Sequence, residues 1–172
     1  MYFVMREDLH IKNRIQFKDI KTRTYIGFKA EETGNIKELS VLFVEGNQDS
    51  VYPDFIEAPF FIVSDRLKLL IEPYDLTVQY RKVILNHNSQ SKQSVYWLIL
   101  PEQRDCLHEK TERYPNDFVK KMVLDREKLR QNRIIQVKAM PIPRLVVQLD
   151  VSEAILRRDM VVEFEMVDVA DK

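Results

Sequence analysis

Hydrophobic and polar residues alternate along several stretches of the chain, and a period of two is typical of strands with one buried face. Shorter continuous apolar runs, which suit more deeply buried strands, separate these stretches. The pattern therefore predicts a chain dominated by β-strands. The predicted strands cover residues 1–5, 24–30, 39–46, 60–63, 76–85, 94–100, 133–139, 144–149 and 160–169.

Helical spacing is found in a first short stretch that begins after Val63. Ser64 is a suitable N-cap, because its hydroxyl can accept a hydrogen bond from an amide of the first turn. Three apolar residues follow at positions that share one helical face. Pro73 cannot continue a helix, so the helix should end just before it. The residues of the apolar face are Leu67, Leu70 and Ile71.

A second helical stretch lies near the end of the chain, between the strands predicted at 144–149 and 160–169. Asp150 is its predicted N-cap, and Glu153, three residues later, would complete a capping box. The predicted buried stripe consists of Val151, Ala154 and Ile155.

These two regions match each other over residues 59–85 and 143–169 without a gap, at an offset of 84 positions. Each contains a strand, a short helix and a second strand, so the sequence predicts a duplicated strand-helix-strand unit. Neither unit alone has enough apolar surface to be stable. We therefore expect one α+β domain over residues 1–172, with a mostly antiparallel or mixed sheet and short helices. The matched pairs include Pro59 and Pro143, Val63 and Val147, Ile71 and Ile155, Asp75 and Asp159, and Val83 and Val167.

Polar residues dominate two connections between the predicted strands. Residues 86–93 link two strands and predict an exposed hairpin loop. Residues 101–117 predict a longer polar excursion, and residues 118–129 a strand followed by a turn.

Balanced charge argues against several classes of function. The chain carries 27 basic and 27 acidic residues, whereas a nucleic-acid-binding protein usually has a basic excess. A basic cluster within residues 120–133 lacks the stacking aromatics of a single-strand binder. With one cysteine no intramolecular disulfide can form, and the sequence predicts neither a secretory leader nor a membrane-spanning segment. We expect a cytoplasmic protein that binds neither nucleic acid nor membrane.

Candidate chemistry is sparse. Only three glycines occur and none follows Gly46, which excludes a glycine-rich phosphate-binding loop. The histidines, His10, His87 and His108, lack metal-ligand spacing, so neither a metal nor a cofactor is expected. Cys106 and His108 could in principle form a nucleophile and its base. No oxyanion-hole signature accompanies them, and a half-buried cysteine beside a surface histidine is the favoured interpretation.

The order of motifs along the chain resembles that of immunity proteins of bacterial polymorphic toxin systems, a family with two V-S-x-x-L-like elements. The sequence departs from that pattern at Gln148, where family members commonly repeat a serine, and residues 101–117 do not match the family's Asp-rich segment. The matching motifs are Tyr2 to Val4, Val63 to Leu70, Tyr96 to Leu100, Met122 to Leu129, Arg133 to Lys138 and Leu145 to Glu165.

The resemblance implies a non-catalytic antidote that binds and neutralises a cognate toxin domain. Because partner recognition is often located in divergent loops, we place the contact surface on residues 86–93 and 101–117. Trp97, Arg104 and Tyr114 are the anchor candidates. Two alternatives stay open, namely an enzyme with an unrecognised site near Cys106 and His108 and a general protein-interaction module. The sequence leaves the oligomeric state open.

Overall fold

The part of the chain that the structure describes contains two curled six-stranded β-sheets, a separate β-hairpin and three short α-helices. In this computed structural model, residues 1–18, 39–87, 92–129 and 132–171 are described. The predicted α+β class with mixed and antiparallel strands is confirmed. The strand predicted at 24–30 lies outside the described residues.

The first sheet has six strands, and all its pairs are antiparallel except that of β3 with β6. Its strands in spatial order are β2 (Gln16–Phe17), β3 (Leu39–Glu45), β6 (Gln79–His87), β7 (Lys92–Leu100), β5 (Ile62–Ser64) and β4 (Phe55–Ile56).

The second sheet also has six strands, and it contains two parallel pairs, β11 with β14 and β12 with β8. Two further strands, β9 (Glu112–Arg113) and β10 (Val119–Lys121), form a separate hairpin. The strands of the second sheet in spatial order are β11 (Val123–Asp125), β14 (Glu163–Ala170), β1 (Tyr2–Arg6), β13 (Arg144–Gln148), β12 (Ile134–Val137) and β8 (Glu102–Arg104).

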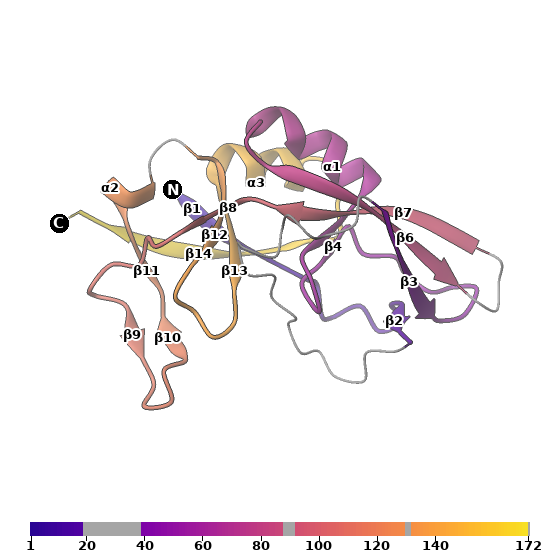
Figure 1. Cartoon of the computed structure of the whole chain (residues 1–172), viewed down its shortest axis with the longest axis horizontal. Helices are drawn as coiled ribbons and strands as arrows, with labels where there is room; N and C mark the ends of the chain where they lie inside the picture. Colours follow the sequence, from indigo (N-terminus) through magenta and orange to yellow (C-terminus); the bar gives the residue numbers. More distant parts are fainter. Residues whose placement is uncertain (19–38, 88–91, 130–131, 172) are drawn as a thin grey trace.

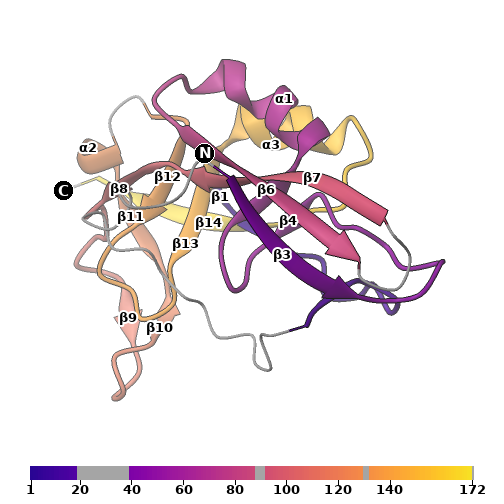
Figure 2. The same cartoon turned by 45° about the vertical axis from the view of Figure 1, so that its right-hand side comes forward.

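The helices α1 (Asp65–Ile71) and α3 (Leu149–Leu156) lie side by side on one side of the molecule (Figure 1). The 3-10 turn η2 (Glu72–Tyr74) follows α1, and the short α2 (Arg126–Leu129) follows β11. Both views show α1 next to α3 while β3 and the far ends of β6 and β7 extend beyond them (Figure 2).

The segments β5-α1-β6 and β13-α3-β14 have the same arrangement in their sheets. In each, the two strands flank one antiparallel strand, which is β7 in the first sheet and β1 in the second. The registers also correspond: Val83 lies opposite Tyr96, and Val167, 84 positions after Val83, lies opposite Tyr2. The two segments therefore share a spatial arrangement, and their origin by duplication stays a prediction.

One apolar core lies between the two segments and the helices, and it takes equivalent residues from both. Each core side chain from the first sheet, α1 and their adjoining residues has a counterpart from the second sheet, α3 and their adjoining residues. The equivalent pairs in this core are Ile99 and Met5, Phe55 and Ile134, Phe61 and Leu145, Val63 and Val147, Leu67 and Val151, Ile71 and Ile155, and Val78 and Val162.

Two buried aspartates link the first sheet to the second through hydrogen bonds. Asp54, just before β4, accepts a hydrogen bond from the Val161 amide at 2.8 Å. Asp75, just before β6, accepts hydrogen bonds from the amides of Arg133 and Ile134 at 2.9 and 3.2 Å. Buried carboxylates require such donors, because an unpaired buried charge is costly.

The predicted start and end of the first helix are confirmed. The Ser64 hydroxyl accepts a hydrogen bond from the Leu67 amide at 3.2 Å, and α1 ends at Ile71. The chain then continues as a 3-10 turn that contains Pro73. Proline is tolerated in the first turn, because the backbone amide proton that it lacks would have no hydrogen-bond partner there.

The predicted N-cap of the second helix is wrong. Gln148 is the N-cap residue of α3, and its side chain donates to the Tyr2 hydroxyl at 2.8 Å instead of capping the helix. Asp150 lies inside the first turn, and Glu153 pairs with Arg157, so no capping box forms. The predicted buried stripe of α3 is confirmed.

The polar connections contain more regular structure than expected. Strands β6 and β7 extend into the region predicted as a loop at 86–93, of which residues 88–91 lie outside the described chain. The excursion at 101–117 contains β8 and β9. Among the described residues no helix is long and apolar enough to cross a membrane.

Candidate interaction surfaces

Trp97, the first predicted anchor, lies half-buried on β7 beneath the start of α1. Its indole nitrogen donates to the Asp65 carboxylate at 2.8 Å. The ammonium groups of Lys68 and Lys82 lie 5.1 and 5.2 Å from the ring centroid, within the range of cation–π attraction. Trp97 is therefore already in contact with α1 and β6, and it packs against the apolar core while remaining only partly buried.

Arg104, the second predicted anchor, is at the end of β8 and is largely buried. One of its terminal nitrogens donates to Glu102 at 2.6 Å and to Asn132 at 2.7 Å. Because these bonds hold the guanidinium inside the molecule, a partner could reach Arg104 only after they break.

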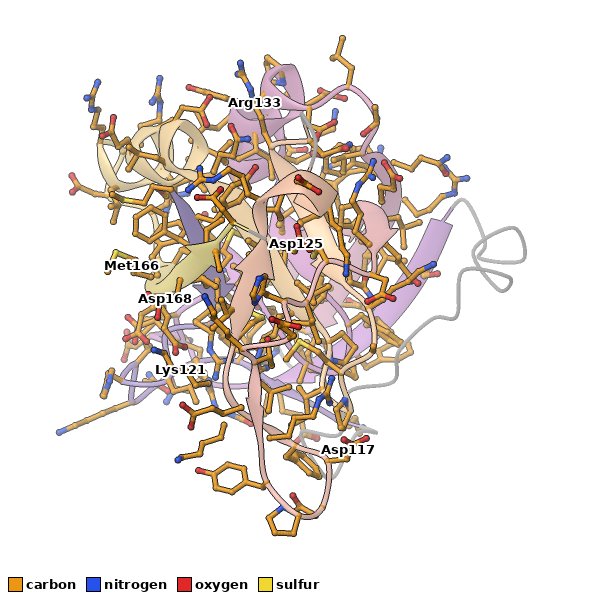
Figure 3. All side chains as sticks on the ribbon, turned by 90° about the vertical axis from the view of Figure 1, so that its left-hand side faces the viewer. Asp117, Lys121, Asp125, Arg133, Met166 and Asp168 are labelled. Carbon is orange, nitrogen blue, oxygen red and sulfur yellow. The ribbon has the colours of Figure 1, made fainter. Side chains whose placement is uncertain are left out.

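Tyr114, the third predicted anchor, is at the tip of the β9–β10 hairpin. It is 51% exposed, and Phe118 across the turn is 43% exposed. The Tyr114 amide donates to the Phe118 carbonyl at 2.8 Å, and the turn passes through Asp117 with a φ of 67°. Figure 3 shows the hairpin projecting away from the sheets, with Asp117 near its end.

Hydrogen bonds hold both the turn and the base of this hairpin in place. Arg113 donates to the Asp117 carbonyl at 3.0 Å and to the Ala139 carbonyl at 2.9 Å. The Thr111 hydroxyl donates to the Val123 carbonyl at 2.9 Å. The tip is thus an exposed aromatic pair on a supported element, which lowers the entropy lost on binding.

A small cleft of about 150 Å³ opens beside the hairpin, between Phe118 and the second sheet. Arg144 lines it and, with Arg6, pairs with Glu57, at 2.8 and 3.4 Å respectively. Burial, together with the neighbouring Arg6 guanidinium, lowers the pKa of Arg144. The cleft combines apolar walls with a guanidinium, a combination that suits a protein side chain.

Cys106 and His108, the alternative site, are both buried within the described fold, so the expected half-buried cysteine and surface histidine are wrong. Burial, reinforced by Asp105, raises the pKa of the Cys106 thiol to about 11. The His108 Nδ1 accepts a hydrogen bond from the Lys110 amide at 3.1 Å. A reactive cysteine needs a lowered pKa and access to solvent, so this arrangement gives no support to thiolate chemistry.

An exposed apolar surface that the sequence analysis missed lies on the first sheet. We call it the open face and define it by Val41, Phe43, Ile84 and Val95. Val41, Ile84 and Val95 are directly opposite one another on β3, β6 and β7. Val41 is 50% exposed, and Phe43 and Val95 are each 40% exposed. Helix α1 packs on β5 and β7, so it covers only part of this side of the sheet.

The second sheet is polar at one of the positions equivalent to the open face, the position of Ile84. Asp168 on β14 corresponds to Ile84, and it pairs with Lys121 at 2.8 Å. Figure 3 shows these two side chains close together at the surface. The arrangement of the strands therefore does not require an apolar residue at the position of Ile84, and the exposed apolar residues beside it on β3 and β7 need an explanation of their own.

Neither comparison of the sequence with known proteins identifies a relative. No family model matches the chain, and no curated protein matches it significantly. The resemblance to immunity proteins therefore stays a prediction. Among the described residues no group of three or more histidine, cysteine, aspartate or glutamate residues could hold a metal ion.

Proposed function

We propose that this chain is a non-catalytic immunity protein that binds the domain of a cognate bacterial toxin and blocks it. One observation carries the proposal, namely the supported β9–β10 hairpin with Tyr114 and Phe118 exposed at its tip. The hairpin lies apart from both sheets, and the motif order along the chain adds the resemblance to such antidotes.

A projecting hairpin suits the task of blocking a concave site. Exposed tyrosine and phenylalanine side chains are common anchors of tight interfaces, because they bury a large area with few rotatable bonds. The ion pair of Lys120 with Glu112, at 3.1 Å, and the exposed Asp117 place charges of both signs around the tip. Those charges would discriminate the cognate toxin from others.

Blocking in this mechanism is steric and needs no bond-breaking step by the antidote. Insertion of the aromatic tip would fill the toxin's substrate site, and the charged rim would add specificity. Its strength would depend on how completely the partner buries the two rings.

Co-expression in a host that the toxin domain kills tests the proposal. The probe is the C-terminal domain encoded directly upstream of this chain. We expect the wild-type chain to rescue growth and to co-purify with that domain in a one-to-one complex. Toxicity without rescue by the wild-type chain, or an upstream domain without toxicity, would overturn the proposal.

A double substitution at the tip, Tyr114→Ala with Phe118→Ala, tests the surface. We expect the affinity for the toxin domain to fall at least about 100-fold, because two central aromatic contacts are lost. Leu69→Ala, at an exposed position of α1, is the matched control and should bind like the wild type. An unchanged affinity of the double variant would place the contact elsewhere.

A further inference from the structure

We propose that the open face is the interface of a symmetric dimer formed by two copies of this chain. The proposal is independent of the proposed function, because it needs no toxin. It rests on the exposed apolar residues of the face, on the charges at its two ends and on the comparison with the second sheet.

The apolar residues of the open face form a continuous patch on a regular sheet. Val41, Ile84 and Val95 form one row across three strands, and Phe43 adds the next position along β3. Backbone hydrogen bonds fix these positions before any partner binds, so little order would be lost on association. Two such faces can stack as sheets do in a sandwich, with strand directions within about 30° of each other.

Charged residues of opposite sign lie at the two ends of this patch. Lys82 precedes Ile84 by two residues on β6, and Glu45 follows Phe43 by two residues on β3. Because β3 and β6 run parallel, Lys82 and Glu45 lie at opposite ends of the face. Both are exposed, and within the described part of the chain neither has an ion-pair partner.

A two-fold axis brings these charges together. The axis would lie between two stacked open faces and run across the strands. It would place Lys82 of each copy opposite Glu45 of the other, with the apolar rows between them. An isologous interface must be complementary to itself, and this distribution of charge meets that condition.

The ring of Trp97 supports the lysine end of this interface. Lys82 and Trp97 are directly opposite each other on β6 and β7, and the ammonium lies 5.2 Å from the ring centroid. The cation–π contact holds the ammonium above the sheet without neutralising it. A carboxylate from another copy would supply the missing countercharge.

The size of the patch indicates a weak dimer. A stable interface usually buries about 800 Å² on each partner, and four partly exposed apolar side chains provide less than that. We therefore expect association that depends on protein concentration, with a dissociation constant in the micromolar range or weaker.

Sedimentation velocity over a wide concentration range tests the dimer. We expect the wild-type chain to shift from monomer towards dimer as its concentration rises. Val41→Glu should remain monomeric, because it places a charge in the apolar row. Leu69→Glu, outside the face and 61% exposed, should dimerise like the wild type. A wild-type chain that stays monomeric at every concentration, or a dimer that Val41→Glu leaves intact, would overturn the proposal.

A charge exchange tests the two-fold arrangement. Lys82→Glu alone and Glu45→Lys alone should each weaken self-association at least tenfold, because each creates two like-charge contacts. An equimolar mixture should recover the dimer, because every cross-pair then has opposite signs. Failure of the mixture to recover would overturn the arrangement. Rescue from the toxin decides the proposed function separately, since the hairpin and the open face lie at opposite ends of the molecule (Figure 1).

Discussion

At the scale of single residues, Asp54 links three segments through one buried carboxylate. It accepts hydrogen bonds from the Ser64 hydroxyl and the Arg66 guanidinium, both at 2.6 Å, and from the Val161 amide at 2.8 Å. Burial raises the pKa of this carboxyl, but the hydrogen bonds from Arg66, Ser64 and Val161 outweigh burial and hold the pKa below its ordinary value.

We expect Asp54→Asn to lower the free energy of unfolding by about 3 kcal/mol at neutral pH, because several buried donors lose a charged acceptor. The folded pKa lies below the unfolded value of about 3.9, so the carboxylate stabilises the fold above that pH. This contribution is lost as the pH falls through the folded pKa. Urea denaturation at pH 7 and pH 3 should therefore show a smaller difference between variant and wild type in acid.

The matched control for this experiment is Asp49→Asn, at an exposed position. Its stability should follow the wild type at both pH values. A difference between Asp54→Asn and wild type that does not shrink in acid would contradict the assigned role of the carboxylate.

A second residue-scale prediction concerns Cys106, whose thiol has a pKa raised to about 11, chiefly by burial. We expect a disulfide reagent at pH 8 to modify the native protein at least about 100-fold more slowly than the urea-unfolded chain, since thiolate and access are both lacking. Equal rates would contradict this.

The raised pKa of the Cys106 thiol also means that the free energy of unfolding falls above about pH 9, because the unfolded thiol ionises at a lower pH than the folded one.

At the scale of elements, the two helices differ at equivalent N-cap positions. Ser64 caps α1 and also donates to Asp54, whereas Gln148, 84 positions later, donates to Tyr2 and leaves α3 without a side-chain cap. The protein therefore allows a helix with a side-chain N-cap to be compared with an equivalent helix that lacks one.

We expect Ser64→Ala to lower the free energy of unfolding by about 2 kcal/mol, because a cap and a hydrogen bond to a buried carboxylate are lost together. Gln148→Ala should cost about 1 kcal/mol or less, because only its hydrogen bond to Tyr2 is lost. Urea denaturation of both variants measures the difference. Equal costs would show that the cap of α1 contributes little.

The sequence predicted most of these elements but not all their boundaries. The alternation of the strands and the N-cap at Ser64 depend only on neighbouring residues, so the sequence alone was enough to predict them. Asp150 carried the same local signal as a cap, but β13 ends at Gln148, one residue before the end of the predicted strand, and α3 already begins at Leu149. Pairing with β1 decides that boundary, and the pairing joins residues far apart in sequence.

The candidate surfaces were harder to predict for a related reason. Alternation indicates that one face of a strand is buried, but not how far a short helix reaches across a sheet. Val41 and Val95 are exposed because α1 packs on β5 and β7 without covering β3 or the far end of β7 (Figure 1). Tyr114 was identifiable because it lies in a polar excursion, whereas nothing in the local sequence distinguishes the engaged guanidinium of Arg104 from a free one.

At the scale of the whole molecule, strand β1 takes the place in the second sheet that β7 takes in the first. Strand β7 follows β6 through a short connection, whereas β1 reaches the same position beside β14 from the other end of the chain. The register of Tyr2 opposite Val167 equals that of Tyr96 opposite Val83 at the 84-residue offset. The second half therefore has the spatial arrangement of the first but a different chain order.

This equivalence predicts that a circularly permuted chain will fold. The permutant begins at His10, in an exposed turn, and carries residues 1–9 after Lys172 through a linker of about six glycine and serine residues. Strand β1 then follows β14 as β7 follows β6, so every strand pair is kept. We expect cooperative unfolding within about 2 kcal/mol of the wild type, measured by circular dichroism in urea.

A chain that lacks residues 1–9 without the transfer is the matched control. It should not unfold cooperatively, because β13 and β14 lose the strand between them and the shared core loses Met5. If the permutant behaved like this truncated chain, folding would require the covalent link between β1 and residue 10. The equivalence of β1 and β7 would then concern only their positions in the sheets. Cooperative folding of the permutant alone would show instead that the shared core, rather than the order of the chain, determines the fold.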